Sequence, residues 1–371
     1  MTNFGEMKAF VAIDSFKGAL GSAAACRAAA DALREAATLS GRPKSSCRPD
    51  DIREFPVSDG GEGFCDCIHH YLGGIWAGIP VTGPEGRTVN ARYLITGKTA
   101  AYLESASACG YTLISGKRHD PRELTTAGVG EMIADAISRG CTRIFLGLGG
   151  TATMDAGLGL RTALRDSFRC GIPDSIEFIA CVDTLAPLTG PNGAAFMYGP
   201  QKGLRKDQLA EADAWLARQA AIFGLSPTTP GFGAAGGLLC GLASVTANLS
   251  IVSGAELLME ISGLRKAVAE ALDSPDSTED NILIITGEGR VDRQSLTGKI
   301  TGRAASLASS PGTGQRAKVI CLAGSVGEGF SPENSGFSEV LTITPEGTPL
   351  DKALADTAAN IRRTLLKHFS V

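Results

Sequence analysis

The segment KAFVAIDSFKG at residues 8–18 decides the class of fold, because an apolar run passes directly into a short charged turn. The run KAFVAI predicts a buried strand, and the alanine-rich sequence after the turn predicts a helix that reaches about residue 37. The same order then repeats: residues 52–57 predict a strand, SDGGEG a loop, and residues 64–72 a helix. This strand–helix–strand–helix order predicts a parallel sheet with ligand-binding loops at the carboxyl ends of its strands.

The central part of the chain has a different pattern. Short runs typical of strands lie between residues 80 and 105, separated by Gly-Pro and Gly-Lys turns, and they suit antiparallel hairpins. After residue 126 we expect helices and strands to alternate again. Their expected order is a helix, a strand at 143–149, a helix up to about 171, a strand near 176–182, a helix at 206–223 and a helix from 234.

The C-terminal part resumes the first pattern, with apolar strands expected at 281–286, 318–323 and 339–343. We therefore predict an α/β protein of two domains. Residues 1–75 and 281–371 are expected to form a Rossmann-like domain around a parallel sheet, built from both chain ends. Residues 76–280 are expected to form an inserted second α/β domain.

The composition argues against several classes of partner. The 371 residues have a formal net charge of −4 and contain no basic block, so we expect no binding to nucleic acid or to membranes. No apolar run approaches the roughly 20 residues that span a bilayer. Ten cysteines without a Cys-x-x-Cys pair, and only four histidines, argue against zinc and for reduced thiols in a cytoplasmic protein. The sequence does not give the oligomeric state, and a homodimer is left open.

Glycine is the outlier of the composition, with 47 residues gathered in short clusters after apolar segments. Glycine lets a backbone approach a ligand closely, so such clusters predict binding loops. The first loop contains Asp14, Ser15 and Lys17. Lys17, expected at a helix start, is suited to neutralise a phosphate or a carboxylate. The alternative is a helix N-cap made by Asp14 or Ser15, with Lys17 in solvent.

The second loop, SDGGEG at residues 58–63, surrounds two carboxylates with glycine. Asp59 and Glu62 suit Mg²⁺, which prefers one or two carboxylates together with waters and phosphate oxygens. The alternative is an anion bound by the backbone amides of Gly60 and Gly61, with Glu62 favoured by the dipole at a helix start.

The third loop, GLGGTATMD at residues 147–155, follows an expected strand and precedes an expected helix. The amides of Gly149 and Gly150 and the hydroxyls of Thr151 and Thr153 could form a cradle for phosphate. Read as GxGxxA, the loop also half-matches the dinucleotide fingerprint. That alternative predicts a nicotinamide-dependent dehydrogenase acting on a small hydroxy acid.

The fourth loop, TGEGRVDRQSLTGK at residues 286–299, combines glycine, two acids, arginine and lysine after a strand. Phosphoryl transfer requires this mixture, because its catalysis is mostly positioning and charge neutralisation. Its candidate binding residues are Gly287, Glu288, Gly289, Asp292 and Lys299.

Taken in order, these loops resemble the bacterial glycerate kinase family, which makes 2- or 3-phosphoglycerate from glycerate and ATP. The similarity covers nearly the whole chain. Its motifs are DSFKG at 14–18, DGGEG at 59–63, TGP at 82–84, TTxGxGE at 125–131, GPQKG at 199–203, GAAGG at 233–237 and TGEGRxDxQ with GK at 286–299. The resemblance implies two α/β domains, with glycerate and ATP-Mg²⁺ meeting in the cleft between them, and it favours 2-phosphoglycerate as the product.

The resemblance also suggests roles for individual residues. Asp183 is our first choice for the base that accepts the proton of a glycerate hydroxyl, and Asp59 is the second. Lys17 and Lys202 would neutralise the substrate carboxylate or the transferring phosphoryl group. The expected substrate-binding residues are Asp14, Ser15, Lys17, Gly60, Gly61 and Lys202. The expected nucleotide-binding residues are Gly149, Gly150, Thr151, Thr153, Gly287, Glu288, Gly289, Asp292 and Lys299. The expected Mg²⁺ ligands are Asp59 and Glu288.

Two segments depart from the usual sequence of the family. The family has GGSATNDGG where residues 149–157 are GGTATMDAG, so that Met154 replaces an asparagine. It has ACDVxNPL where residues 180–188 are ACVDTLAPL, so that the acid moves one place to Asp183. Both changes leave the substrate preference open. A further alternative is a non-catalytic binding protein for small acids, which predicts glycerate binding without release of ADP.

Overall fold

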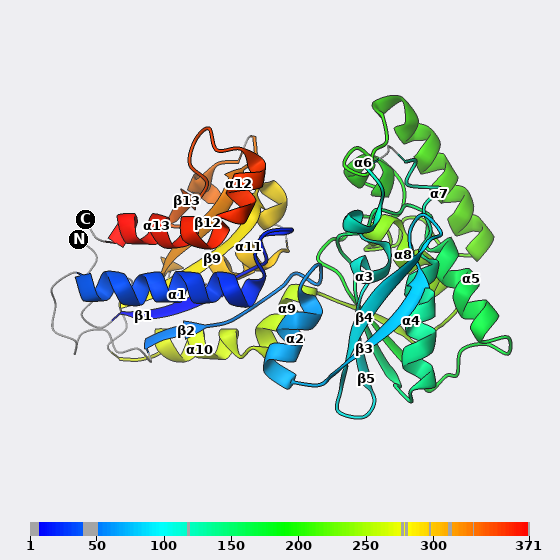
Figure 1. Cartoon of the computed structure of the whole chain (residues 1–371), viewed down its shortest axis with the longest axis horizontal. Helices are drawn as coiled ribbons and strands as arrows, with labels where there is room; N and C mark the ends of the chain where they lie inside the picture. Colours follow the sequence, from blue (N-terminus) through cyan, green and yellow to red (C-terminus); the bar gives the residue numbers. More distant parts are fainter. Residues whose placement is uncertain are drawn as a thin grey trace. The chain divides into compact units, whose positions relative to one another are not determined.

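The computed structural model describes residues 7–39, 51–116, 119–275, 278, 281–296, 298–310, 314–328 and 330–369. Contacts between residues divide the chain into two compact units (Figure 1). Unit 1 is Met1–Asp59 with Ala255–Val371, and unit 2 is Gly60–Gly254. Unit 1 is therefore discontinuous in sequence.

Unit 1 is built on a five-stranded sheet of order β13-β12-β9-β1-β2, in which every pair is parallel. Both faces are covered, which explains why the strands are almost uniformly apolar. One face packs on α1 and α13, which lie side by side in Figure 1, and the other on α9, α10 and α11. The strands are β1 Lys8–Ile13, β2 Ile52–Glu54, β9 Ile282–Val291, β12 Lys318–Val326 and β13 Glu339–Thr342.

The helices of unit 1 connect these parallel strands. They are α1 Ser22–Leu39, α9 Gly254–Ile261, α10 Leu264–Leu272, α11 Ile300–Ser306, α12 Leu350–Ala355 and α13 Thr357–Phe369. The minor elements among the described residues of unit 1 include the 3₁₀ helices Arg293–Leu296 and Pro332–Asn334 and the short antiparallel pair β10 Ser309–Ser310 and β11 Gly314–Gln315.

Unit 2 is built on a six-stranded sheet of order β3-β4-β5-β6-β7-β8. The pairs β3–β4 and β4–β5 are antiparallel, and the pairs β5–β6, β6–β7 and β7–β8 are parallel. The strands are β3 Ile75–Thr82, β4 Thr88–Thr96, β5 Ala100–Glu104, β6 Arg143–Gly147, β7 Glu177–Cys181 and β8 Leu249–Val252. The carboxyl ends of β5 to β8 therefore lie along one edge of this sheet.

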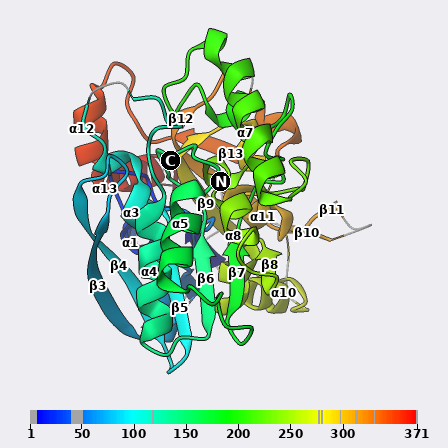
Figure 2. The same ribbon diagram turned by 90° about the vertical axis from the view of Figure 1, so that its right-hand side faces the viewer.

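Helices cover both faces of the second sheet. The main core packs beneath α4, α5, α7 and α8, which Figure 2 shows on the face toward the viewer. On the other face, Phe64 of α2 contacts Tyr102, which stacks on Phe145 with ring centroids 4.4 Å apart. The helices are α2 Phe64–Leu72, α3 Ala106–Cys109, α4 Ala127–Ser138, α5 Leu158–Ser167, α6 Ala194–Tyr198, α7 Leu209–Phe223 and α8 Leu238–Ala243. Three 3₁₀ helices complete the unit: Tyr111–Leu113, Lys206–Gln208 and Ala234–Gly236.

The predicted α/β class with parallel strands is confirmed. The predicted domain boundaries near residues 75 and 280 differ from the division between the units. Helix α2 packs on β4 and β5 and so belongs to unit 2, whereas α9 and α10 contribute buried residues to the core around β1 and β9 in unit 1. Within the described part of the chain, no helix has the length and apolarity needed to cross a membrane.

Several local expectations differ from the structure. Residues 75–82 form β3, a strand missing from the predicted order. The helix after DSFKG begins only at Ser22, so Asp14 and Ser15 do not cap it and Lys17 is not at its start. Strand β9 continues through TGEGRV to Val291, because it stays paired with β12 as far as Val326.

Candidate functional site

In unit 1 the candidate residues lie in or after the carboxyl-terminal parts of three adjacent parallel strands, β2, β1 and β9. The N–H of Asp14 donates to the carbonyl of Gly287 at 2.9 Å, which joins the ends of β1 and β9. The Ser22 hydroxyl donates to the carbonyl of Ile13 at 2.6 Å and accepts the N–H of Val57 at 2.8 Å. Ser22 therefore fixes the end of β1 against the segment that follows β2, a role that its place before an alanine-rich helix did not reveal.

The first loop forms a tight turn rather than the start of a helix. The N–H of Phe16 donates to the carbonyl of Leu20 at 2.8 Å, and the N–H of Leu20 donates back to Phe16 at 2.9 Å. Asp14 and Ser15 are buried, while the side chain of Lys17 is exposed. The turn thus places a buried acidic residue and an exposed lysine within four residues.

The charged groups of this region act on one another. Burial raises the pKa of Asp14 well above its usual range, and the neighbouring Asp59 and Glu288 raise it further, against the opposing effect of Lys17. Asp59 is the main reason that the pKa of Lys17 is raised, with Asp14 and Glu288 adding to the effect. Four predicted site residues therefore lie within electrostatic reach of one another.

Glu288 lies in β9, and its side chain is buried, with 6% of the residue exposed. Its Oε2 accepts from Lys299 Nζ at 2.8 Å, and its Oε1 accepts from the hydroxyl of Thr301 at 2.8 Å. Burial alone would lower the pKa of Lys299, but Glu288, Asp59 and Asp292 raise it above its ordinary value. Thr301, at the start of α11, is a further member of the cluster that sequence analysis missed.

The two glycines beside Glu288 have different roles. A side chain at Gly287 would lie 2.4 Å from the carbonyl oxygen of Leu322 in β12, so this position needs glycine for strand packing. At Gly289 the nearest atoms to a side chain would be those of Phe16 and Lys17, at 3.8 and 3.9 Å. Only Gly289 therefore leaves space beside the Lys17 turn. Asp292 donates its N–H to the hydroxyl of Ser295 at 3.0 Å, at the end of the same strand.

The carboxylates of unit 1 fit a hard divalent cation. A nearby positive charge would relieve the mutual repulsion of Asp14, Asp59 and Glu288. In the part of the chain that the structure describes, no group of three or more His, Cys, Asp or Glu side chains could hold a metal by itself. The donor set therefore suits Mg²⁺ shared with phosphate oxygens, since Mg²⁺ takes one or two carboxylates in such sites. Because Lys299 and Thr301 already occupy both oxygens of Glu288, Asp14 is a further candidate ligand.

In unit 2 the glycines of the second and third loops pack against each other. A side chain at Gly147 would lie 2.4 Å from the carbonyl oxygen of Gly60, and one at Gly149 would lie 2.7 Å from Cα of Gly61. Gly60 has φ +93° and lies against Cys181 at the end of β7. We call this contact between Gly60 and Gly61 on one side and Gly147 and Gly149 on the other the glycine crossing. Here the absence of side chains lets two backbone segments approach closely, whereas in a dinucleotide fingerprint it lets the backbone approach a pyrophosphate.

Lys202 contacts the third loop directly. Its Nζ donates to the hydroxyl of Thr151 at 2.9 Å and to the carbonyl of Thr153 at 2.8 Å. Burial lowers the pKa of Lys202 to about 8, although Cys109 and Asp155 oppose this. The structure therefore brings together Lys202 and the predicted phosphate loop, whose Gly150 has φ +69°.

Asp155 fixes the end of that loop. Its carboxylate accepts hydrogen bonds from the N–H and hydroxyl of Thr126 and from the N–H groups of Gly157 and Gly159, at 2.8 to 3.0 Å. These bonds join the starts of α4 and α5. The adjacent Met154, which replaces the asparagine of the family, is fully buried in the core of unit 2. The change thus places an apolar side chain in the core.

Asp183 follows β7, and its Oδ1 accepts from the hydroxyl of Ser253 at 2.6 Å. Ser253 follows β8, so this bond joins the ends of two neighbouring strands. At the end of β5, Glu104 Oε1 accepts the N–H of Cys65 at 2.7 Å, and burial raises the pKa of Glu104 to about 7. Sequence analysis missed both Ser253 and Glu104, although each is a polar residue at the carboxyl end of a predicted or observed strand.

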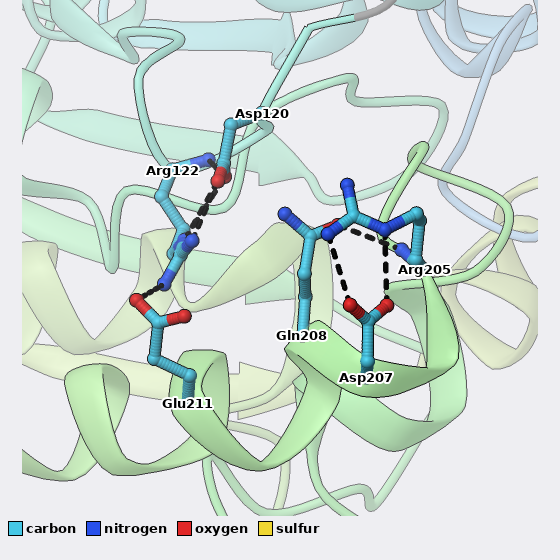
Figure 3. A network of polar contacts seen from close by, with 6 residues as sticks. All are labelled: Asp120, Arg122, Arg205, Asp207, Gln208 and Glu211. Carbon is cyan, nitrogen blue, oxygen red and sulfur yellow. Dashed lines mark hydrogen bonds and ion pairs between the residues drawn. The ribbon is translucent and has the colours of Figure 1, made fainter.

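A group of polar contacts lies at the start of α7 (Figure 3). Arg122 donates to Asp120 at 2.6 Å and to Glu211 of α7 at 3.0 Å. Beside it, Arg205 pairs with Asp207, and the N–H of Arg205 donates to Gln208 Oε1 at 2.9 Å. These contacts fix the 3₁₀ helix Lys206–Gln208 and the start of α7, which come after the GPQKG turn in the sequence.

The predicted site residues thus fall into three groups, and their individual roles remain predictions. Unit 1 brings together Asp14, Ser15, Lys17, Asp59, Gly287, Glu288, Gly289, Asp292 and Lys299. Unit 2 brings together Gly149, Gly150, Thr151, Thr153 and Lys202. Gly60, Gly61 and Asp183 lie near the end of β7 in unit 2. The prediction places the whole SDGGEG loop in the Rossmann-like domain, whereas the division between the two compact units falls between Asp59 and Gly60.

Comparison with known proteins places these motifs in a family. The glycerate kinase family model matches residues 9–169 and 171–370. A glycerate 2-kinase of Escherichia coli K12 is 32% identical, with 96% of each chain covered. A glycerate kinase of Halalkalibacterium halodurans is 30% identical, covering 93% of this chain and 92% of the relative.

A solved structure agrees with the sequence comparison. A protein of Salmonella typhimurium LT2 that was assigned as glycerate kinase 2 superposes with a TM-score of 0.69 at 26% identity. The match covers 98% of this chain and 97% of that one. The chain therefore belongs to the glycerate kinase family, a family of phosphotransferase enzymes, as the order of its motifs predicted.

Proposed function

We propose that this chain transfers the γ-phosphoryl group of ATP to a hydroxyl group of glycerate, with 2-phosphoglycerate as the favoured product. The observation that supports this most directly is the charged cluster of unit 1, in which Lys17 and Lys299 lie among Asp14, Asp59 and Glu288. Phosphoryl transfer is promoted mainly by positioning and charge neutralisation, and this cluster is suited to both. The E. coli relative named glycerate 2-kinase supports the choice of product.

In the proposed reaction, Asp183 accepts the proton of the glycerate hydroxyl. The hydroxyl oxygen forms a bond to the γ-phosphorus as the bond from that phosphorus to the β–γ bridging oxygen breaks, and ADP leaves. The hydrogen bond from Ser253 orients the carboxylate of Asp183 at 2.6 Å. Asp59 is the second choice of base.

The lysines would balance negative charge during the transfer. Lys17 is held as a cation by Asp59, and Lys202 is directed at the third loop by Thr151 and Thr153. We assign the substrate carboxylate or the transferring phosphoryl group to these two ammonium groups. Fixed charges in a site with little water are worth more than the same charges in solution.

Mg²⁺ would neutralise charge on the phosphates, held by Asp59 with Glu288 or Asp14. Within the chain, Lys299 and Thr301 keep Glu288 oriented. The N–H groups of Gly149 and Gly150 and the hydroxyl of Thr151 are suited to bind phosphate oxygens.

The test is an assay that couples ADP release to a signal, with glycerate, ATP and Mg²⁺. Release of ADP that requires glycerate, with the product phosphate located by ³¹P and ¹H NMR, would support the proposal and give the position phosphorylated. Separate titrations with ATP-Mg²⁺ and with NAD(H) compare the kinase with the dehydrogenase alternative. Glycerate-dependent reduction of NAD⁺, or glycerate binding without any ADP release, would contradict the proposal.

A further inference from the structure

Unit 2 has a cavity of about 740 Å³ beside α5, away from all the predicted site residues. Its walls come from α5, from the segment after α5 up to Ile172, and from Ser244 and Val245 after α8. Figure 2 shows α5 and α8 on the face toward the viewer. The volume falls within the range of small-molecule sites, which is roughly 300–1,000 Å³.

Three arginines dominate the lining of this cavity: Arg161, Arg165 and Arg169. A spacing of four residues places Arg161 and Arg165 on the same face of α5, and Arg169 continues the row just beyond the helix end. The only acid in the lining is Asp166, so the cavity is cationic in a chain whose net charge is −4. Among the described residues, none of the three arginines forms an ion pair with a carboxylate.

The helix dipole explains only part of this row. Cations are favoured near the carboxyl end of a helix, where Arg165 and Arg169 lie. Arg161 is in the first turn of α5, where the dipole disfavours a positive charge. Like charges four residues apart on a helix are also destabilising. Helix stability therefore does not account for Arg161.

Arg161 is held in one orientation by its surroundings. Its Nε donates to the hydroxyl of Ser244 at 3.1 Å, and its guanidinium lies 4.9 Å from the ring centre of Phe223. Burial lowers the pKa of Arg161, and the charge of Arg165 lowers it further. The surroundings of Arg161 therefore disfavour its positive charge. A fixed guanidinium beside two others is arranged as an anion receptor would be, because its planar donors match the oxygens of phosphate.

We propose that this cavity binds a small anion that carries phosphate, at a site separate from the phosphoryl-transfer residues. Arg161 is the fixed contact, while the more exposed Arg165 and Arg169 close on the remaining oxygens. Asp166 restricts the site to ligands that do not place negative charge against its carboxylate. No step of the proposed kinase reaction requires this site.

The test is isothermal titration of the full chain with inorganic pyrophosphate, for the wild type and for the R165A/R169A variant. We expect binding to the wild type to weaken at least about tenfold in the variant, because two charged contacts are lost. The matched control is R218A, since Arg218 is an exposed arginine of α7 outside the cavity. Its pyrophosphate affinity should equal that of the wild type, and turnover should be unchanged in both variants.

Two further variants keep the test decisive. D166N should tighten pyrophosphate binding, because it removes the only negative charge of the lining, and unchanged or weaker binding would count against the proposal. K17A separates this site from the phosphates of the kinase site. If K17A abolishes all pyrophosphate binding, or if R165A/R169A binds as tightly as the wild type, the cavity is not the anion site. Thermal unfolding of each variant checks that it is folded.

Discussion

The two lysines proposed to neutralise charge lie in different units, and their surroundings differ. Lys17 in unit 1 stands among carboxylates, and Asp59 raises its pKa. Lys202 in unit 2 is bonded to a hydroxyl and a carbonyl, and burial lowers its pKa to about 8. Unit 1 thus stabilises its cation with opposite charges, whereas unit 2 holds its cation with neutral groups. A weakly compensated ammonium group attracts an incoming anion more strongly, but it also loses its proton more easily.

The largest expected effect concerns which unit supplies the base. Asp183→Asn should lower kcat by about 10²–10⁴, the usual contribution of a positioned acid or base, while leaving folding intact. Asp59→Asn should mainly weaken the binding of Mg²⁺, so that half-maximal activity requires a higher Mg²⁺ concentration. Its loss of kcat at saturating Mg²⁺ should be smaller. Steady-state kinetics of both variants over a range of Mg²⁺ concentrations decide between them. Near-normal turnover in Asp183→Asn would remove it as the base and favour Asp59.

The next prediction uses the pH dependence of kcat/KM to distinguish the titration of Lys202 from that of Lys17. Because the pKa of Lys202 is about 8, kcat/KM should fall as the pH rises through that value. Lys202→Arg keeps its charge, so its alkaline limb should lie well above pH 9, even if its turnover is lower. Lys17→Arg is the matched control and should retain the limb near pH 8. An unchanged limb in Lys202→Arg would assign that titration to another group.

The same shift also predicts how stability depends on pH. The folded state gives up the proton of Lys202 near pH 8, whereas the unfolded chain keeps it until about 10.5. Between these values the unfolded state binds more protons, so the contribution of Lys202 to the free energy of unfolding rises with pH. Urea unfolding at pH 8 and pH 10 should therefore show a larger rise for the wild type than for Lys202→Met. Equal changes in the two proteins would contradict the lowered pKa.

A smaller effect tests the glycine crossing of unit 2. Gly149→Ala would place a methyl group 2.7 Å from Cα of Gly61, which should lower the free energy of unfolding by about 1–3 kcal/mol. Gly78→Ala is the control, because a Cβ added there would have no heavy atom within 4 Å apart from those of its own residue and its chain neighbours. Chemical denaturation of both variants measures the difference. A neutral Gly149→Ala would mean that this glycine is kept for a ligand rather than for packing.

The smallest effect concerns the network in Figure 3. Arg122→Ala removes the pairs to Asp120 and Glu211 and should cost about 1 kcal/mol, because the Arg122 side chain is only 14% exposed. Arg205→Ala removes an exposed pair and should leave the unfolding midpoint nearly unchanged. Thermal and urea unfolding of the two variants give the comparison. Equal effects would show that the burial of Arg122 does not matter.

Sequence patterns predicted the elements whose apolar residues form clear runs. Residues 64–72 are helical as expected, and the strand expected near 176–182 is β7, Glu177–Cys181. Strand β3 was missed because Gly78 and Pro80 weaken its pattern, yet proline is tolerated there because β3 is at the edge of the sheet. Strand β8 was missed because it has only four residues and is partly exposed at the other edge.

The candidate site could be predicted in composition but not in its contacts. Gly287 and Glu288 looked like parts of a loop, because glycine is rare inside strands, and only the pairing of β9 with its neighbours β1 and β12 shows them in a strand. The motif in SDGGEG gave no sign that a domain boundary lies within it. The raised pKa of Lys17 depends on Asp59, which is distant in the sequence, and the lowered pKa of Lys202 depends on its burial in the folded unit.

The crossing of Gly60 and Gly61 with Gly147 and Gly149 limits how this enzyme can evolve. Side chains at Gly147 and Gly149 would enter space that backbone atoms of Gly60 and Gly61 occupy, at 2.4 and 2.7 Å. A larger residue at position 147 or 149 cannot be compensated by a smaller one at position 60 or 61, because glycine is already the smallest. Second-site suppressors of Gly149→Ala should therefore be absent from residues 60 and 61, and they would have to arise where the backbone itself can move.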